Sequence, residues 1–505
     1  MSPNDARLVR NTAVTVLALV ALRLVGATWT PLTFDEAYYW TWSKHLAFGY
    51  YDHPPAVALV IRLGTLIAGD TELGVRLVSI LLALPMSYAV YRAAVILFGG
   101  QRVAATATIL LNVTRMAAVG TLVVTPDSPL LVASSFIVLC LAKVLETGRG
   151  AWWLAVGAAV GAALLSKYTA LFFGPAILIW LISVPKLRRW LISPWPYLGG
   201  VVSLLIFSPV ILWNADHHWV SFIKQLGRSR VEDFKPVFLA ELVPTQIVFA
   251  TPLVFILGAM GLYALLRRGG GASAARGLIN AIFWTIVLYF TLHALHARVE
   301  ANWFAPVYPV FAIAAAVAAN LTRWDRHQQR VVDFCLRWAA PTGILMFALL
   351  IVQANTGALT GYRRDATVRS VGVGWTELAA AIETVRAHSG ATCVLAPDYG
   401  TTGWLAFYLP KGTCVAQITQ RIRWVNMPEP DAAQLSGRLL YVDEARPGGQ
   451  PYLPSSLKDS FARIERVAEL SRKRGPLIIE NYALDLLEGA KGDVLDRSPP
   501  PELLP

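Results

Sequence analysis

The sequence is divided into long apolar blocks, which are separated by short stretches that contain Arg, Gly and Pro. A helix needs roughly 17 to 25 mostly apolar residues to cross the hydrocarbon core of a bilayer, and the blocks approach that length. Hydrophobic residues make up 55% and charged residues 15% of the 505 residues, whereas a soluble domain carries roughly 25% charge. The pattern predicts a polytopic α-helical membrane protein and excludes disordered, collagen-like and coiled-coil chains.

The blocks predict about eleven membrane-spanning helices. The first block contains Arg23, which requires a polar partner within the membrane. It is followed by acidic residues instead of a small-residue cleavage site, so we interpret it as a retained helix and not as a signal peptide. The predicted spans are Asn11–Trp29, Leu77–Phe98, Val103–Val119, Leu130–Val144, Ala151–Ser166, Ala170–Val184, Leu198–Trp213, Ile247–Leu266, Leu278–Leu292, Val307–Ala319 and Trp338–Val352. In the long loop after the first span, Ala37–Leu46 and Ala56–Ile67 are predicted as short helices that lie along the membrane interface.

Lys and Arg residues fall on alternate short loops between the predicted spans. Since cytoplasmic loops carry the excess of positive charge, the N-terminus is predicted to be cytoplasmic, and an odd number of spans places everything after about Gly357 outside. This topology accounts for the net charge of +12 without nucleic acid as a partner. The predicted domains are a transmembrane domain (residues 1–356), an outer α/β domain (357–496) and a disordered Pro-rich tail (497–505).

The acidic residues of the membrane region are concentrated in the outer loops. Asp35 and Glu36 lie directly beyond the first span, where carboxylates are costly and need partners or a function. A carboxylate can act as the general base for an acceptor hydroxyl or amine, so both are candidate catalytic residues. The alternative is a solvated pair that ends the helix. Asp127, in the next outer hairpin, is a third candidate, with helix capping as the alternative.

Basic side chains in the outer loops are candidates for binding a lipid phosphate. His53 precedes two prolines, and Arg228 and Arg230 lie in an interfacial loop with aromatic neighbours. Lys167 and Arg298 lie at outer helix ends. The alternatives are a surface His in a turn, headgroup-facing charge, and side chains that snorkel to the interface.

The last third of the chain is more highly charged and contains no spanning block. It predicts helices at Trp375–His388 and Phe461–Leu470, and strands at Thr392–Leu395, Cys414–Ile418 and Leu439–Val442. These elements predict the small outer α/β domain.

The four cysteines form no metal-like cluster, so no metal site is assigned. Cys393 and Cys414 fall in neighbouring predicted strands of the outer domain, where an oxidising compartment permits a disulfide. Cys140 and Cys335 are expected to be free. No nucleotide-binding fingerprint is present.

Together, the outer-loop motifs resemble the bacterial GT-C membrane glycosyltransferases, similar to protein O-mannosyltransferases and lipid A aminoarabinose transferases. The resemblance covers about residues 10–320. The motifs that carry it are Phe34-Asp35-Glu36-Ala37-Tyr38-Tyr39-Trp40, Tyr51-Asp52-His53-Pro54-Pro55, Gly74-Val75-Arg76-Leu77, Thr125-Pro126-Asp127-Ser128-Pro129-Leu130, Leu165-Ser166-Lys167-Tyr168, Trp213-Asn214-Ala215-Asp216 and Glu300-Ala301-Asn302-Trp303.

The resemblance implies that Asp35 is the catalytic Asp of the first outer loop and that Asp127 is a second acidic site residue. It places His53 where aminoarabinose transferases carry a Lys that contacts the donor phosphate, and His is only partly charged at neutral pH. Glu300 and Asn302, in the last matched motif, are further candidates for contacting substrate.

The resemblance also implies a polyprenyl-phosphate sugar donor and a lipid, glycan or protein acceptor on the outer face of the bacterial inner membrane. One base, with cations near the departing phosphate, fits an inverting displacement. No cofactor is assigned, and a divalent metal requirement is left open. One alternative is a transporter or flippase of lipid-linked sugars, which needs polar residues near the middle of the membrane. The other is an O-antigen ligase or polymerase, for which key Arg and His residues are expected in one large outer loop.

Overall fold

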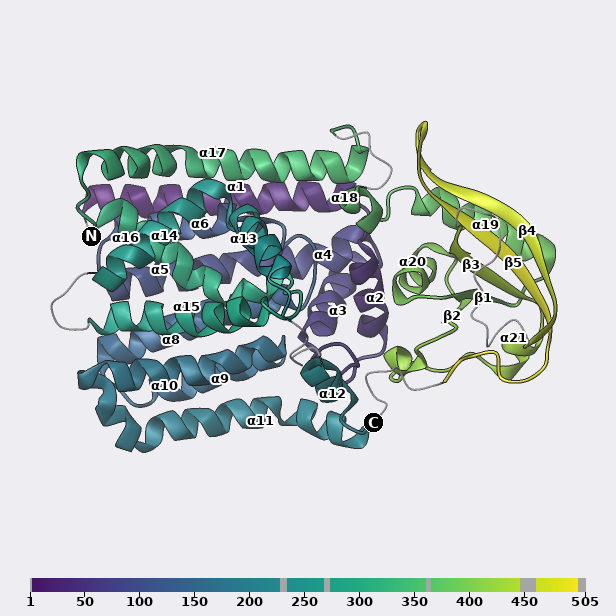
Figure 1. Cartoon of the computed structure of the whole chain (residues 1–505), viewed down its shortest axis with the longest axis horizontal. Helices are drawn as coiled ribbons and strands as arrows, with labels where there is room; N and C mark the ends of the chain where they lie inside the picture. The colour runs from purple at the N-terminus through teal and green to yellow at the C-terminus, as the bar shows by residue number, and fades with distance from the viewer. Residues whose placement is uncertain (1, 228–233, 268–272, 360–364, 446–459, 498–505) are drawn as a thin grey trace.

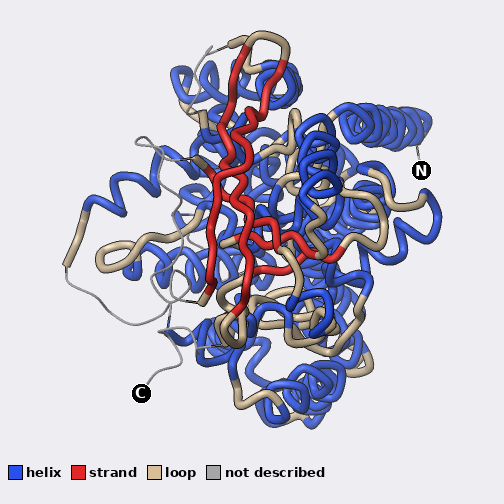
Figure 2. Tube along the Cα trace, turned by 90° about the vertical axis from the view of Figure 1, so that its right-hand side faces the viewer, coloured by secondary structure: helices blue, strands red, loops and turns tan. Residues whose placement is uncertain are grey.

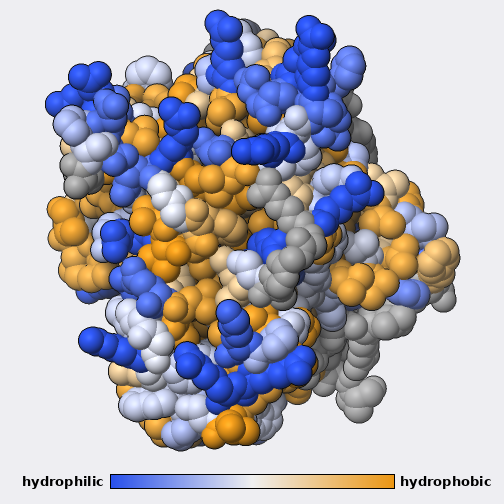
Figure 3. Space-filling model, turned by 90° about the vertical axis from the view of Figure 1, so that its left-hand side faces the viewer, coloured by the Kyte–Doolittle hydropathy of each residue, from blue (hydrophilic) through white to orange (hydrophobic). Residues whose placement is uncertain are grey.

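The computed structural model describes residues 2–227, 234–267, 273–359, 365–445 and 460–497. They form a long helical bundle with a β-sheet region at one end, and the N-terminus lies at the opposite end (Figure 1). Figure 3 faces that opposite end and shows hydrophilic side chains gathered around hydrophobic ones. Of the predicted disordered tail, only Arg497 lies within the described residues.

Seven helices of the described residues are long and apolar enough to cross a membrane, or eight if a bent pair is counted as one span. The protein is therefore a polytopic helical membrane protein, while the finer count of about eleven spans stays a prediction. The bundle contains α1 (Pro3–Trp29), α4 (Glu72–Leu81), α5 (Ala83–Phe98), α6 (Gln101–Val113), α7 (Arg115–Ala118), α8 (Asp127–Thr147), α9 (Trp152–Leu164), α10 (Phe173–Ser183), α11 (Pro194–Asp216), α13 (Val237–Ala250), α14 (Pro252–Arg267), α15 (Ala274–His293), α16 (Tyr308–Asn320) and α17 (Arg326–Thr356).

The predicted span at Ile247–Leu266 is not one straight helix. Helices α13 and α14 meet there at an angle of 103°. The break lies at Thr251, whose φ of 64° is left-handed, and Pro252 begins the next helix. Proline disfavours helical backbone in the residue before it, which explains why the apolar run bends at this point.

Helices of the bundle differ in how much surface they bury. Buried residues make up 83% of the apolar stretch that ends in α16. They make up only 28% and 22% of the apolar stretches of α1 and α17, which lie at the periphery. Arg23 of α1 nevertheless faces inward, and its Nη2 donates to the carbonyl oxygen of Asn112 at 2.7 Å and to Asn112 Oδ1 at 3.2 Å. These contacts supply the polar partner that an arginine within the membrane requires.

Two short helices, α2 (Phe34–Lys44) and α3 (Ala56–Ala68), lie between the first two long helices in sequence. Both lie at the end of the bundle that faces the sheet (Figure 1). Short helices were predicted here from the sequence, and the structure contains them. They build the surface on which the candidate site lies.

The C-terminal region is a five-stranded mixed sheet in the order β2-β1-β3-β5-β4, with helices beside it. Strand β1 pairs in parallel with β2 and β3, whereas β3 and β4 pair antiparallel with β5. Figure 2 shows a long two-stranded ribbon lying across the end of the bundle. The elements are α18 (Ala366–Ser370), α19 (Trp375–Ser389), β1 (Cys393–Ala396), α20 (Tyr399–Tyr408), β2 (Cys414–Gln417), α21 (Ala432–Ser436), β3 (Leu439–Glu444), β4 (Phe461–Arg474) and β5 (Leu477–Ala490).

The prediction of a helix at Phe461–Leu470 is wrong, because this segment belongs to strand β4. Its Ala, Glu and Arg content favours a helix, but β4 pairs with β5 along its length. Tertiary pairing overrides local propensity here. The parallel pairing of β1 and β2 places Cys393 beside Cys414, and the structure joins them in a disulfide with a Cα–Cα distance of 4.6 Å. Cys140 and Cys335 are free and buried.

Candidate active site

The first turn of α2 fixes the position of Asp35. Thr33 is the N-cap, its hydroxyl accepts from the Glu36 amide, and the Glu36 carboxylate accepts from the Thr33 amide. This capping box begins the helix at Phe34 and makes Asp35 its second residue. The alternative of a loose, solvated acidic pair beyond the first span is therefore wrong.

Glu36 is fully buried and acts as an anchor. Arg76 Nε donates to Glu36 Oε1 at 2.7 Å and Arg76 Nη2 to Oε2 at 2.6 Å, and neither side chain is exposed. The amide of Val124 donates to Oε1 at 3.0 Å, which ties the loop before α8 to α2. A carboxylate whose oxygens are occupied in this way supports the local structure and is not available as a base.

Asp35 is in a different environment, because it is only partly buried. Among the described residues, the one hydrogen bond to its carboxylate comes from the Tyr399 hydroxyl, which donates to Oδ1 at 3.1 Å. Burial raises the pKa of Asp35 to about 6, even though the Tyr399 hydrogen bond acts to lower it. A carboxylate with a pKa near 6 is ionised at neutral pH and is a stronger base than an ordinary Asp.

Asp52 lies at the centre of a second group of charges next to Asp35. Lys224 of α12 (Val220–Gly227) forms a buried ion pair with Asp52 Oδ1. Arg423 Nη1 donates to both carboxylate oxygens at 2.7 Å, and the Tyr38 hydroxyl donates to Oδ2 at 2.9 Å. Burial acts to raise the pKa of Asp52, but Lys224 and Arg423 hold it well below its usual value.

Asp127 belongs to a third buried group. Lys167 Nζ donates to its two carboxylate oxygens at 2.8 and 2.9 Å, and Asn302 Nδ2 donates to Oδ2 at 2.5 Å. The capping alternative is wrong, because the N-cap of α8 is Pro126 and Asp127 is the first helical residue. The structure thus brings together three predicted site residues from distant parts of the sequence.

Of the remaining predicted residues, His53 directly follows Asp52 and interacts electrostatically with it, whereas the others lie apart from these groups or outside the described residues. Arg298 is exposed and pairs with Glu241 at 2.9 Å, and Glu300 is also exposed. His53 is partly buried, with its ring 6.3 Å from that of Tyr39 between centroids. Arg228 and Arg230 lie outside the described residues.

Sequence reasoning missed three functional candidates. Asp52 belongs to one of the outer-loop motifs, but no role was predicted for it. Tyr399 and Arg423 come from the C-terminal region, 364 residues from Asp35 and 371 from Asp52. Nothing in their local sequence distinguishes them from other Tyr and Arg residues.

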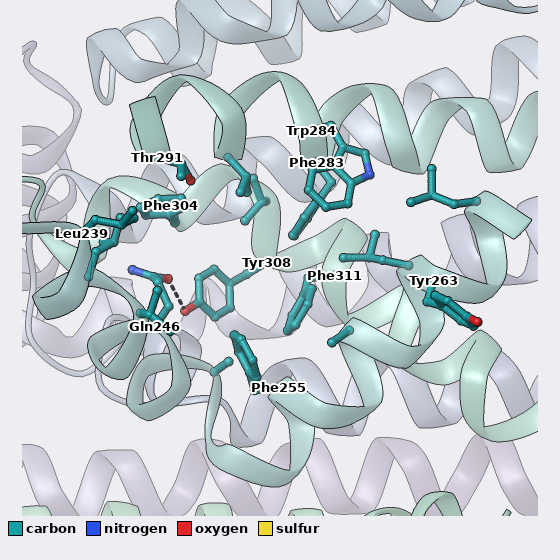
Figure 4. Close-up of a pocket in the computed structure, with 18 residues that line it drawn as sticks. Leu239, Gln246, Phe255, Tyr263, Phe283, Trp284, Thr291, Phe304, Tyr308 and Phe311 are labelled. Carbon is teal, nitrogen blue, oxygen red and sulfur yellow. Dashed lines mark hydrogen bonds between the residues drawn. The ribbon is translucent and has the colours of Figure 1, made fainter. Parts of the chain in front are cut away.

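An apolar cavity of about 450 Å³ lies between α13, α14, α15 and α16 (Figure 4). Phe255, Phe283 and Phe311 line it, together with other apolar side chains. At one end, the Tyr308 hydroxyl donates to Gln246 Oε1 at 3.3 Å. In the described part of the chain, no group of three or more His, Cys, Asp or Glu residues is placed to hold a metal ion.

Comparison with known proteins shows what this chain is similar to. Residues 52–213 match the sequence family of dolichyl-phosphate-mannose-protein mannosyltransferases. This match, with the relatives described next, confirms the resemblance to GT-C membrane glycosyltransferases and the prediction of an enzyme of this class.

One curated relative is a lipid A galacturonosyltransferase, RgtD, from Rhizobium johnstonii, which is 25% identical over 341 residues, or 65% of this chain and 67% of that protein. The structure of ArnT from Cupriavidus metallidurans in the apo state has a TM-score of 0.66 at 15% identity and covers 94% of this chain and 98% of ArnT. The structure of ArnT bound to undecaprenyl phosphate has a TM-score of 0.63 at 18% identity, over 94% and 97% of the two chains. The fold is therefore that of the GT-C enzymes.

Proposed function

We propose that this protein transfers a sugar from a polyprenyl-phosphate donor to lipid A or a related lipid-borne glycan, with Asp35 as the general base. The observation that carries the proposal is the environment of Asp35. Its carboxylate is partly exposed, has a raised pKa near 6, and lies next to the Asp52, Lys224 and Arg423 group. A base beside buried cations is what a displacement at an activated sugar requires.

In the proposed reaction, Asp35 removes a proton from the acceptor hydroxyl or amine. The acceptor atom then forms a bond to the anomeric carbon of the sugar, and the bond from that carbon to the phosphate oxygen breaks. The polyprenyl phosphate leaves with the electron pair, and one displacement inverts the anomeric centre. Lys224 is our candidate for the cation that stabilises the leaving phosphate.

In this proposal, one wall of the site is shaped by the cluster that Asp127 forms with Lys167 and Asn302. Two hydrogen bonds from backbone amides link the segments of this cluster to the Asp35 region. The amide of Ala56 donates to the Leu165 carbonyl at 2.9 Å, and the amide of Val124 donates to Glu36. Glu36 receives a supporting role and not a catalytic one.

The choice of donor and acceptor rests on relatives. One of the two ArnT structures is bound to undecaprenyl phosphate, and the curated relative is named for galacturonosyl transfer to lipid A. The apolar cavity between α13 and α16 is suited to an isoprenoid or acyl chain, because apolar ligands bury their surface in such cavities. We place the site on the periplasmic face of the inner membrane, at the end of the bundle opposite the N-terminus.

The test is a transfer assay with purified protein in detergent. Undecaprenyl-phosphate-linked galacturonic acid or aminoarabinose is mixed with lipid A, and the products are analysed by mass spectrometry. We expect lipid A to gain the mass of one sugar residue while undecaprenyl phosphate accumulates in equal amount. Protein that moves the donor across vesicle membranes without forming a product would instead support the flippase alternative.

A further inference from the structure

The C-terminal region packs closely against α2, which carries Asp35. A Cβ atom added at Gly403 of α20 would lie 2.8 Å from the Tyr38 backbone nitrogen, a distance that side chains do not tolerate. The Trp404 indole nitrogen donates to the Leu32 carbonyl at 3.0 Å, just before α2 begins. Helix α20 therefore lies backbone to backbone on α2, and its position relative to Asp35 is set by these contacts.

This packing brings Tyr399 to Asp35. Tyr399 is the first residue of α20, and its N-cap Asp398 accepts from the Gly400 and Thr401 amides at 2.9 Å each. Its ring centroid lies 4.8 Å from that of Tyr38. With the start of the helix capped and the ring packed, the hydroxyl is held where it donates to Asp35 Oδ1.

Arg423 connects the same region to the charges next to Asp35. Its guanidinium lies 4.8 Å from the centre of the Tyr399 ring while Nη1 binds both oxygens of Asp52. Because Lys224 binds the same carboxylate, Asp52 joins three segments that are far apart in the sequence: the first outer loop, α12 and the C-terminal region.

We propose that Tyr399 and Arg423 are positioning residues of the active site, so that the C-terminal region completes the site. The inference rests on the proposed role of Asp35 as base. Tyr399 holds one carboxylate oxygen by donating to it, which leaves the second oxygen directed toward the proton of the acceptor. Arg423 fixes Asp52 and, through the Tyr399 ring, limits the movement of the Tyr399 hydroxyl.

The charged and titratable groups that act on Asp35 come from three parts of the chain. Tyr399 and Arg423 belong to the C-terminal region, Glu36 and Tyr39 to its own helix, and Asp52 to the following loop. Burial, Asp52 and Glu36 raise the pKa of Asp35, whereas the hydrogen bond from Tyr399 and the charge of Arg423 lower it. Removing the Tyr399 hydroxyl should therefore move this pKa upward. The hydroxyl itself stays protonated, because burial raises the pKa of Tyr399 well above its usual value.

The test is Tyr399→Phe in the full-length protein, with transfer measured from pH 5 to 9. Phe keeps the ring that packs on Tyr38 and removes only the hydroxyl. We expect kcat at pH 7 to fall roughly ten- to a hundredfold, the scale of a misplaced reacting group. We also expect the acidic limb of the kcat profile to move to higher pH, while the KM for the donor changes less than about twofold, because the hydroxyl contacts Asp35 and not the donor.

Tyr408→Phe is the matched control. Tyr408 ends the same helix. Its hydroxyl accepts from the Leu32 amide at 3.2 Å and donates to Glu72 Oε1 at 3.1 Å, and within the described residues it makes no hydrogen bond to Asp35. This control should keep the kcat and the pH profile of the unmodified protein. A second variant, Arg423→Gln, should move the acidic limb in the same direction as Tyr399→Phe, and Arg423→Lys should restore part of the effect.

The possible results separate the two proposals. If Tyr399→Phe and Arg423→Gln both keep the normal kcat and pH profile while Asp35→Asn is inactive, the positioning role is wrong and the proposed function stands. If Asp35→Asn itself remains active, the proposed base is wrong. If Tyr408→Phe shifts the profile as much as Tyr399→Phe, the effect belongs to α20 in general, and the specific role of the Tyr399 hydroxyl is overturned.

Discussion

At the level of single residues, the two adjacent carboxylates of α2 have opposite environments. Glu36 is held by an arginine and backbone amides with no exposure, whereas the Asp35 carboxylate accepts one hydrogen bond from the described part of the chain and is partly exposed to solvent. The motif predicts where both residues lie in the chain. It cannot predict which of the two carboxylates is held by an ion pair and which stays partly exposed, because their partners Arg76 and Tyr399 come from other segments.

Asp35→Asn is the direct test of the base. Asn has nearly the same shape and still accepts from Tyr399, but it does not take up a proton. We expect normal folding and a loss of transfer of roughly a hundredfold or more, the usual scale for a general base. The assay is sugar transfer to lipid A by purified protein.

Asp70→Asn is the control for charge alone. Asp70 lies between α3 and α4, where it pairs with Lys44 and accepts from the Trp40 indole at 3.0 Å. It should lose little activity. Asp35→Asn with most of its turnover intact would remove Asp35 from the mechanism.

The pH dependence follows from the raised pKa of Asp35. Below about pH 6 the carboxylate is protonated and cannot accept the proton of the acceptor. Transfer should therefore fall on the acidic side with a midpoint near pH 6, and about tenfold per unit well below it. A profile of kcat from pH 4.5 to 8 checks this. A midpoint near 4, the ordinary value for Asp, would contradict the described burial of this group.

At the level of elements, the pair of Glu36 and Arg76 joins the end of α1 to α2 and α4. Arg76 also donates to the Pro31 carbonyl at 3.0 Å. Glu36→Gln would leave the Arg76 charge buried without a counter-charge, and removing one partner of a buried pair costs about 3–5 kcal/mol. We expect a clear fall in the thermal unfolding temperature in detergent.

Glu241→Gln is the matched control for that change. It breaks the exposed pair with Arg298, in which the two side chains are 45% and 62% exposed. Exposed pairs contribute about 0–1 kcal/mol, so its unfolding temperature should hardly change. Equal effects of the two substitutions would mean that the Glu36 pair is not buried as described.

The sequence predicted helices better than it predicted their interruptions. Hydrophobic blocks mark most of the long helices of the bundle, and α2 and α3 were expected as short interfacial helices in the loop after the first span. The bend at Thr251 and the strand β4 were missed, since a left-handed backbone residue and a pairing partner are decided by the fold and not by local composition.

At the level of the whole molecule, the N-terminus and the sheet lie at opposite ends of the bundle (Figure 1). The site lies between the bundle and the sheet, so it is formed by parts of the chain that are more than 350 residues apart. The sequence could identify the segment between the first two long helices as a candidate functional region. It could not identify the contribution of the C-terminal region, because no periodicity or motif connects the two.

The disulfide provides a test of which side of the membrane the sheet faces. Cys393 and Cys414 should be oxidised in protein isolated from cells, because the periplasm permits disulfides and the cytoplasm does not. Mass spectrometry after alkylation under denaturing conditions should show two modified cysteines, and four after reduction. Four modified cysteines before reduction would indicate that the sheet faces the cytoplasm and would reverse the predicted topology.

The apolar cavity between α13 and α16 is bordered by Val243, Tyr263 and Trp284, which are 49%, 44% and 41% exposed on the outside of the bundle. In a membrane, that outside is lipid. A long-chain substrate held in this cavity never has to leave its leaflet, and it reaches the enzyme by lateral diffusion in two dimensions. The effective substrate concentration is then its mole fraction in the bilayer, so dilution with buffer leaves the rate unchanged, whereas dilution with inert lipid lowers it.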